Sequence, residues 1–299
     1  VQYETLTQSN PKQAKIGYQI NFGPLFTLDS ISYENFPASA DSLLVVTRTA
    51  RKIKRGDAFD ASALEAERTR ISNLFRNNGY YYYQPGYASY LADTLRVPTK
   101  VQLKFQLADS VPARALRKWY IGRVDLNLRK QFMEPLSNTM EVKKIQVHFN
   151  GKRSPIRPRI ILHDLQLRPN KVFSYDKYME SSDKISSNGL FSFVDFQFTP
   201  RDSTAQCDTL DLALNCLFDK KYDVYVETNY SGRTSGRMGP GLILGFTKRN
   251  AFRGGEKLDI NLKGSYEWQT GHTPSGASDR THTYEYGGDA SLEIPRFIF

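Results

Sequence analysis

Hydrophobic and polar residues alternate without a break from Leu258 to Trp268. One side of this segment carries Leu, Ile, Leu, Gly, Tyr and Trp, and the other carries Asp, Asn, Lys, Ser and Glu. Eleven residues at about 3.3 Å each, tilted by roughly 45°, are long enough to cross the core of a bilayer. The pattern is typical of an outer-membrane barrel strand, although a soluble sheet with one wet face would give the same alternation.

The neighbouring segments repeat this alternation. Further strands are predicted over 222–230, 242–247 and 284–294, with a turn at Arg253-Gly254-Gly255. Four consecutive antiparallel strands cannot close a barrel, which needs about eight. We therefore expect residues 221–299 to hold the first strands of a transmembrane β-barrel that is incomplete in this chain, and the chain to be part of a longer protein.

Gly232 and Gly236 lie where the first two of these strands meet. They would either weaken packing at the seam of the barrel or form an ordinary hairpin turn, and the sequence alone leaves both interpretations open.

Composition limits how the chain can meet a membrane. It has 299 residues and a mean hydropathy of −0.52, and no run approaches the roughly 20 apolar residues of a transmembrane helix. Any membrane contact would therefore be through a barrel or a surface. No secretory signal is visible at Val1, so we expect a mature or internal start. Cys207 precedes a predicted strand and Cys216 lies within it, which would hold the two cysteines roughly 30 Å apart, so we expect no disulfide between them.

Positive charge is concentrated in one stretch. Residues 113–172 hold fourteen Lys and Arg against four acids, a difference that equals the whole net charge of +10. Such a cluster suits lipid headgroups or an acidic partner, or is simply a solvated face. RNA-binding aromatics at module spacing are absent, so we expect no nucleic acid partner.

Two segments share one layout of helix and strands. In the first, Asp60 is predicted to cap a helix that ends at Asn78-Gly79, and strands follow at Tyr80–Tyr83 and Lys100–Leu107. In the second, a shorter helix after Phe173 ends at Asn188-Gly189. Strands are predicted after it over 190–198 and 210–218.

The spacing of the two segments supports a duplication. Thirty residues separate Gly79 from Asp109, and thirty separate Gly189 from Asp219. Each segment also has a strand ahead of its helices, which gives the order β-α-α-β-β. Those leading strands are predicted over 27–33 and 119–128, and 15–22 is predicted as the last strand of an earlier unit.

Tandem β-α-α-β-β units followed by alternating strands resemble a known family. They are similar to the polypeptide-transport-associated (POTRA) domains and surface-antigen barrel of the BamA/TamA outer-membrane assembly factors, and look closest to the TamA-like lipoprotein branch. The residues that carry the resemblance are Gly56-Asp57-Ala58-Phe59-Asp60, Asn78-Gly79-Tyr80-Tyr81, Leu167-Arg168-Pro169, Asn188-Gly189-Leu190-Phe191 and Phe246-Thr247-Lys248-Arg249-Asn250.

The resemblance implies an α+β fold in four parts. These are the end of a preceding POTRA module (1–24), a POTRA module (25–112), the module nearest the barrel (113–220) and the first barrel strands (221–299). The chain departs from the family pattern at 129–171, a long stretch between the first strand and the helix of the second module.

No motif for catalysis is present. The chain has no nucleophile elbow, phosphate-binding loop or zinc-protease helix. His148, His163, His272 and His282 are scattered without metal-ligand spacing. We therefore expect no enzyme activity, no cofactor and no metal.

Backbone recognition is the alternative to chemistry, because an exposed sheet edge can pair with a visiting strand. Candidate edges are Tyr80–Tyr83, 190–198 and 222–230. The alternative interpretations are that these strands are covered in the full chain, and that Tyr80–Tyr83 packs in a core. The candidate residues for binding client strands are Tyr81, Tyr83, Phe193, Val224 and Val226. The candidates for headgroups or an acidic partner are Lys143, Lys144, Lys152, Arg153, Arg157, Arg159, Arg168 and Lys171.

The sequence thus predicts an outer-membrane protein with periplasmic POTRA modules that helps unfolded clients insert into or cross the membrane. Expected partners are unfolded outer-membrane proteins, outer-membrane lipid and accessory periplasmic or lipoprotein subunits. A two-partner secretion pore, the stalk and barrel anchor of a lipid hydrolase, and a soluble periplasmic scaffold are the alternatives.

Overall fold

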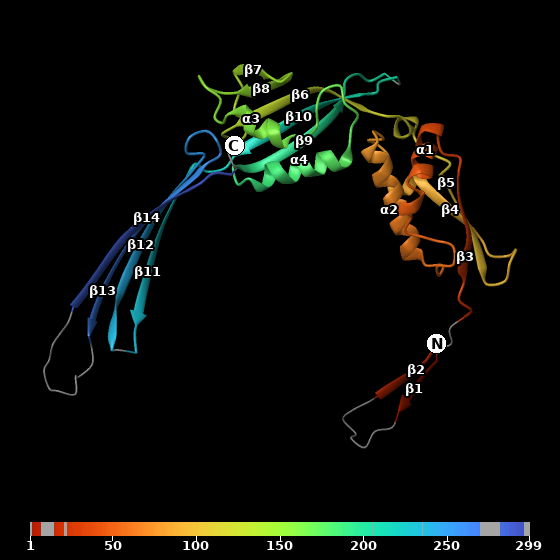
Figure 1. Ribbon diagram of the computed structural model, residues 1–299, viewed down its shortest axis with the longest axis horizontal. Coiled ribbons are helices and arrows are strands. Elements are labelled where there is room, and N and C mark those ends of the chain that lie inside the picture. The colour runs from red at the N-terminus through yellow and green to blue at the C-terminus, as the bar shows by residue number, and fades with distance from the viewer. Residues whose placement is uncertain are drawn as a thin grey trace. The chain divides into compact units, whose positions relative to one another are not determined.

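The computed structural model describes residues 2–6, 15–20, 23–204, 206–234, 236–269 and 282–295 (Figure 1). The chain divides into two compact units, Val1–Arg117 and Lys118–Phe299. The first unit begins with β1 (Gln2–Leu6) and β2 (Lys15–Gln19), which pair as antiparallel strands. The strand expected from residue 15 is therefore present.

The rest of the first unit is a β-α-α-β-β module. Its sheet has the order β3-β5-β4, in which β3 and β5 are parallel and β4 is antiparallel to β5. The main elements are β3 (Thr27–Glu34), α1 (Ala38–Val46), α2 (Ala61–Asn77), β4 (Ala88–Asp93) and β5 (Lys100–Leu107), with 3-10 turns at Arg48–Ala50, Pro85–Tyr87 and Ala113–Leu116. The order of elements is the one that the sequence predicts.

Helix α2 begins and ends where its sequence signals lie. The Asp60 carboxylate accepts a hydrogen bond from the Ser62 backbone N–H at 3.1 Å, which satisfies one of the free amides of the first turn. Gly79 follows the helix with φ +102°, a conformation that other residues rarely adopt. The apolar stripe of α2, with Leu64, Ile71 and Phe75, is fully buried against the sheet.

The strand predicted at Tyr80–Tyr83 is wrong. These residues form a turn after α2, and the second strand of the module is β4, at Ala88–Asp93. Tyr80 and Tyr83 are buried, with ring centroids 5.5 and 4.8 Å from that of Phe75. The alternative interpretation, core packing, is confirmed for these two residues, because aromatic contacts with α2 outweigh the strand preference of tyrosine.

The second unit opens with a larger module of the same kind. Its sheet has the order β7-β8-β6-β10-β9. Helix α4 covers one face, where Tyr178 contacts the rings of Phe196 and Phe198 at 5.3 and 5.6 Å. The elements are β6 (Tyr120–Arg129), β7 (Asn138–Val142), β8 (Ile145–Phe149), α3 (Pro158–Asp164), α4 (Tyr175–Ser187), β9 (Phe191–Pro200) and β10 (Thr209–Phe218). Cys207 and Cys216 are both buried and free.

The long stretch 129–171 extends this sheet. Its hairpin β7–β8 turns at Lys143 and Lys144, both with positive φ, and β8 pairs in parallel with β6. The hairpin therefore covers the edge that β6 would otherwise expose (Figure 1).

Four long antiparallel strands complete the unit in the order β11-β12-β13-β14 (Figure 1). They are β11 (Tyr222–Gly232), β12 (Arg237–Arg249), β13 (Lys257–Gln269) and β14 (His282–Glu293). Gly236 has φ +78° in the turn after β11, where the Arg233 N–H donates to the Arg237 carbonyl at 2.7 Å. The hairpin interpretation of Gly232 and Gly236 is thus confirmed.

Candidate functional site

One face of the four-stranded sheet is continuously apolar. The register places Val226 opposite Leu244, Leu244 opposite Leu262, and Leu262 opposite Gly288, so the alternation of all four strands is in phase. Val224, Leu262 and Tyr286 are 72%, 58% and 90% exposed, and no apolar side chain in the described part of β11–β14 is buried. Such an area is not stable against water, so this face needs an apolar environment or a partner.

The opposite face carries a polar network that crosses every strand. The ring of Tyr225 on β11 lies over Gly245 on β12, so its hydroxyl reaches Asn261 on β13 and donates to Oδ1 at 2.8 Å. Asn261 Nδ2 donates to Asp289 on β14 at 2.8 Å, and Lys263 pairs with that carboxylate at 3.1 Å. A Cβ at position 245 would collide with the Tyr225 ring, so glycine is required there.

The predicted candidates Val224 and Val226 lie on an open edge. β11 pairs only with β12, so its outer backbone groups have no strand partner within the described chain. Both side chains project from the apolar face and are more than half exposed. A visiting strand could pair with this edge and place its own apolar side chains on the same face.

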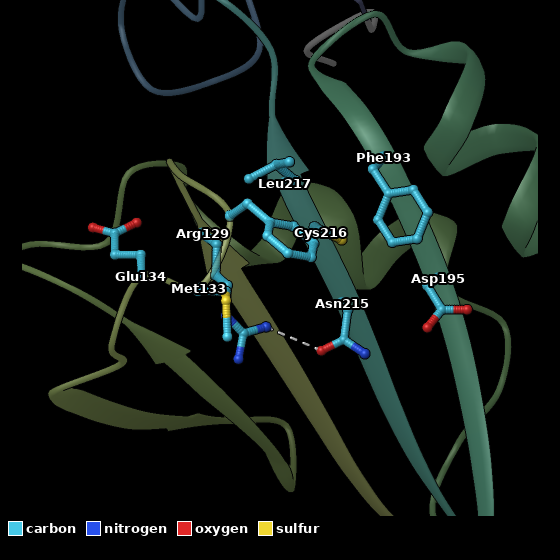
Figure 2. Close-up of a pocket in the computed structure, with 9 residues that line it drawn as sticks. Arg129, Met133, Glu134, Phe193, Asp195, Asn215, Cys216 and Leu217 are labelled. Carbon is cyan, nitrogen blue, oxygen red and sulfur yellow. Dashed lines mark hydrogen bonds between the residues drawn. The ribbon is translucent and has the colours of Figure 1, made fainter.

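Phe193 lies on a second open edge, β9. It is 54% exposed. Its side chain projects from one face of the sheet, and the side chain of Phe196, whose ring contacts α4, projects from the other face. There Phe193 borders a hollow of about 420 Å³ with Arg129 at the end of β6, Met133 in the loop after β6, and residues of β10 (Figure 2). Asn215 in this hollow accepts hydrogen bonds from Arg129 and Asn127, at 3.2 and 2.9 Å.

The third open edge is not where the sequence placed it. Tyr83 is buried and Tyr81 lies in the turn after α2, so neither belongs to a strand edge, and this prediction is corrected. The sheet of the first module has β3 and β4 as its outer strands, and Leu91 on β4 is 55% exposed. The signal that could have identified β4 is the β-favouring residue Tyr90, in a short segment that follows the turn residues Pro85-Gly86.

The predicted basic residues separate into two groups. Lys143, Lys152, Arg153, Arg157 and Arg159 line one hollow, together with Arg253 from the turn between β12 and β13, which the sequence analysis did not include. Lys144, Arg168 and Lys171 do not line it. The Arg168 guanidinium instead donates to the Leu162 carbonyl at 2.7 Å, in the last turn of α3.

The described residues contain no group of three or more metal-binding side chains. None of the helices in the described ranges is both long and apolar enough to span a membrane.

Solved structures with a similar arrangement of elements share little sequence with this chain. The crystal structure of BamA from Haemophilus ducreyi lacking POTRA domains 1–3 is 12% identical with a TM-score of 0.52, and covers 89% of this chain and 47% of that one. This chain has the fold of BamA's POTRA modules and part of its barrel. The four-stranded sheet matches a partial barrel, and the predicted fold class is confirmed. The chain spans about half the length of that BamA structure.

Two further similarities are weaker. Haemophilus influenzae BamA POTRA3–5 is 10% identical with a TM-score of 0.39, covering 72% of this chain and 70% of that one. CdiB from Acinetobacter baumannii is 13% identical with a TM-score of 0.35, covering 96% and 53%. Both of these TM-scores lie below 0.5, so the conclusion about the fold rests on the Haemophilus ducreyi structure. No protein-family model and no curated protein matches the chain.

Proposed function

We propose that this chain belongs to an outer-membrane assembly or secretion factor that binds unfolded client strands at open sheet edges. The observation that carries the proposal is the sheet β11–β14, with an apolar face on which no described side chain is buried, a polar network on the other face and an unpaired edge at β11. A bilayer satisfies the first of these features, an enclosed polar interior the second, and a client strand the third.

The modules suit the same activity. Strand addition uses backbone N–H and C=O groups, so one edge can accept many different sequences. Edges β4 and β9 are open in the two modules, and each carries an exposed apolar side chain, Leu91 or Phe193, that a client could contact. The proposal places the modules in the periplasm and the sheet in the outer membrane, and it assigns no catalytic step. The finer assignment to the TamA-like lipoprotein branch stays a prediction from the sequence.

Site-specific photocrosslinking in cells tests the proposal. A photoreactive residue at Leu91, Phe193 or Val226 is expected to capture newly made outer-membrane proteins, because all three lie on open edges. Matched controls at Asp41 on α1 and Lys177 on α4 are exposed but lie on helices, which offer no strand pairing. Equal capture at edge and helix positions, or none at any edge, would refute client binding by strand addition.

The same experiment separates the proposal from a secretion pore. A general assembly factor yields crosslinks to many outer-membrane proteins, whereas a two-partner secretion pore yields one dominant client. Integration of the full chain into vesicles tests the sheet directly, because a soluble scaffold would stay in solution without detergent.

A further inference from the structure

Two adjoining hollows in the second unit form one basic groove. They have volumes of about 880 and 840 Å³ and share Arg153, Ser154 and Arg253 as a common wall. Together they are lined by ten Lys and Arg side chains and only two acids, Glu141 and Asp219. Asp219 is already paired, at 3.5 Å, with Arg249.

Most of the positive charge of the groove has no counter-charge beside it. Six of its cations are Lys143, Lys152, Arg153, Arg157, Arg159 and Arg253, and among the described residues none of them forms an ion pair. Like charges gathered without acids repel one another, so the arrangement carries an electrostatic cost unless an anion binds.

The backbone beneath these cations is fixed by two parts of the chain that are far apart in sequence. The Arg157 N–H donates to the Arg253 carbonyl at 2.9 Å, and Asn250 Nδ2 donates to the Pro155 carbonyl at 2.9 Å. The buried Ser154 hydroxyl donates to the Ile156 carbonyl at 2.6 Å. The groove is therefore a preorganised site between the stretch 129–171 and the end of β12, with side chains free to contact a ligand.

The position of the groove favours one class of anion. Arg249, which lines it, is the last residue of β12, and Phe246 on the apolar face lies three positions earlier. The cations thus begin where the apolar band ends, which is the level of lipid phosphates if the sheet spans a bilayer. Guanidinium and ammonium groups bind phosphate oxygens through charge-assisted hydrogen bonds, and each hollow is larger than a single free phosphate requires.

We propose that this groove binds the phosphate groups of anionic phospholipids at the membrane surface. The inference rests on the proposed function, because that proposal places the apolar face in the bilayer. Bound lipid would hold the second module against the membrane, and the interaction would weaken as salt screens the charges.

Titration of soluble lipid into the full chain, held in non-ionic detergent, tests the groove. Calorimetry with short-chain phosphatidylglycerol is compared with short-chain phosphatidylcholine, inorganic phosphate and polyglutamate. We expect phosphatidylglycerol to bind at least tenfold more tightly than the other three. The triple variant Lys152→Gln, Arg153→Gln, Arg159→Gln is expected to lose about 100-fold in affinity. It keeps Arg157 and Arg253, whose backbones join the module to the sheet.

A control triple removes the same charge outside the groove. Lys144→Gln, Lys171→Gln, Lys177→Gln is expected to change the affinity less than about threefold, because none of these residues lines either hollow. Equal losses in the two triples would show general charge attraction and overturn the site. Binding of inorganic phosphate as tight as that of the lipid would indicate a free-anion site, and preference for polyglutamate would indicate an acidic protein; either overturns the proposal.

Failure of the groove can be told apart from failure of the proposed function. Insertion of the wild-type chain into neutral phosphatidylcholine vesicles is measured separately, by resistance to carbonate extraction. Insertion without phosphatidylglycerol binding would refute the groove alone. Phosphatidylglycerol binding without insertion would refute the membrane assignment of the sheet, and with it the placement of the groove at a membrane.

Discussion

A buried carboxylate in the first module gives a prediction whose size follows from its contacts. Glu67 on α2 is fully buried and accepts four hydrogen bonds. They come from the Tyr33 hydroxyl at 2.5 Å, the Lys52 N–H at 2.9 Å, and Arg70 Nε and Nη2 at 2.9 and 2.6 Å. This one side chain connects β3, α2 and the loop between the helices.

Glu67→Ala would leave Arg70, whose side chain is 11% exposed, without its counter-ion. Removing one partner of a buried ion pair costs roughly 3–5 kcal/mol. A small domain has only about 5–15 kcal/mol of stability, so the module is expected to open far more often. Amide exchange in α2 should become faster by about two to nearly four orders of magnitude.

Hydrogen exchange measured by mass spectrometry on the full chain tests this. Peptides from α2 and β5 are expected to lose protection, while peptides from α4, in the other unit, serve as an internal reference. The matched variant is Glu65→Ala on the same helix, whose exposed pair with Arg68 at 2.6 Å is worth about 0–1 kcal/mol. If α2 exchanges no faster in Glu67→Ala than in Glu65→Ala, the network does not stabilise the module.

The same site predicts how stability depends on pH. Burial by itself would raise the pKa of Glu67, but hydrogen bonds from Arg70, Tyr33 and Lys52 outweigh it, so the pKa lies below its ordinary value of 4.5. A lowered pKa contributes stability that is present above the ordinary value and is lost as pH falls through the folded value. Protection of α2 should therefore decrease below about pH 4.5 in the wild type, and depend less on pH in Glu67→Ala.

Three further outcomes are expected. Gly245→Val should displace the Tyr225 ring and cost about 1–3 kcal/mol in thermal unfolding of the detergent-held chain, whereas Tyr225→Phe removes one hydrogen bond and costs about 1 kcal/mol; equal effects would contradict the seating of the ring. Burial raises the pKa of the Cys216 thiol to about 12, so in a Cys207→Ser background iodoacetamide at pH 8 should alkylate Cys216 only after unfolding. Arg168→Met should destabilise the second module by about 1.5–3 kcal/mol and leave phosphatidylglycerol binding unchanged, because its guanidinium holds the Leu162 carbonyl; weaker lipid binding would return Arg168 to the groove.

The alternation of apolar and polar residues predicts the four-stranded sheet well, because no other local signal in these segments contradicts it. In Leu258–Trp268 every polar residue lies on one face, and the observed register puts the apolar residues of neighbouring strands opposite one another. The helix α2 is equally readable, since its cap at Asp60 and the glycine at its end are local signals.

Tyr80–Tyr83 shows where local pattern fails. Strand propensity describes an isolated segment, whereas these rings find partners on α2 and along the following turn. The prediction that the basic residues form one cluster fails for a different reason. These residues are close in sequence, but α3 directs Arg168 into the fold, and the groove is completed by Arg253, 81 positions beyond the end of the stretch 113–172. No spacing rule connects those two segments.

The seat of Tyr225 on Gly245 has a consequence for how the strands align. A slip of β11 by two residues would bring the ring over Ile243 or Thr247, which have side chains in its way. A slip between β12 and β13 would move Asn261 out of reach of the hydroxyl. The contacts of Tyr225 thus depend on the alignment of three strands at once. A hairpin in the wrong register loses these contacts and is less stable before β14 has paired.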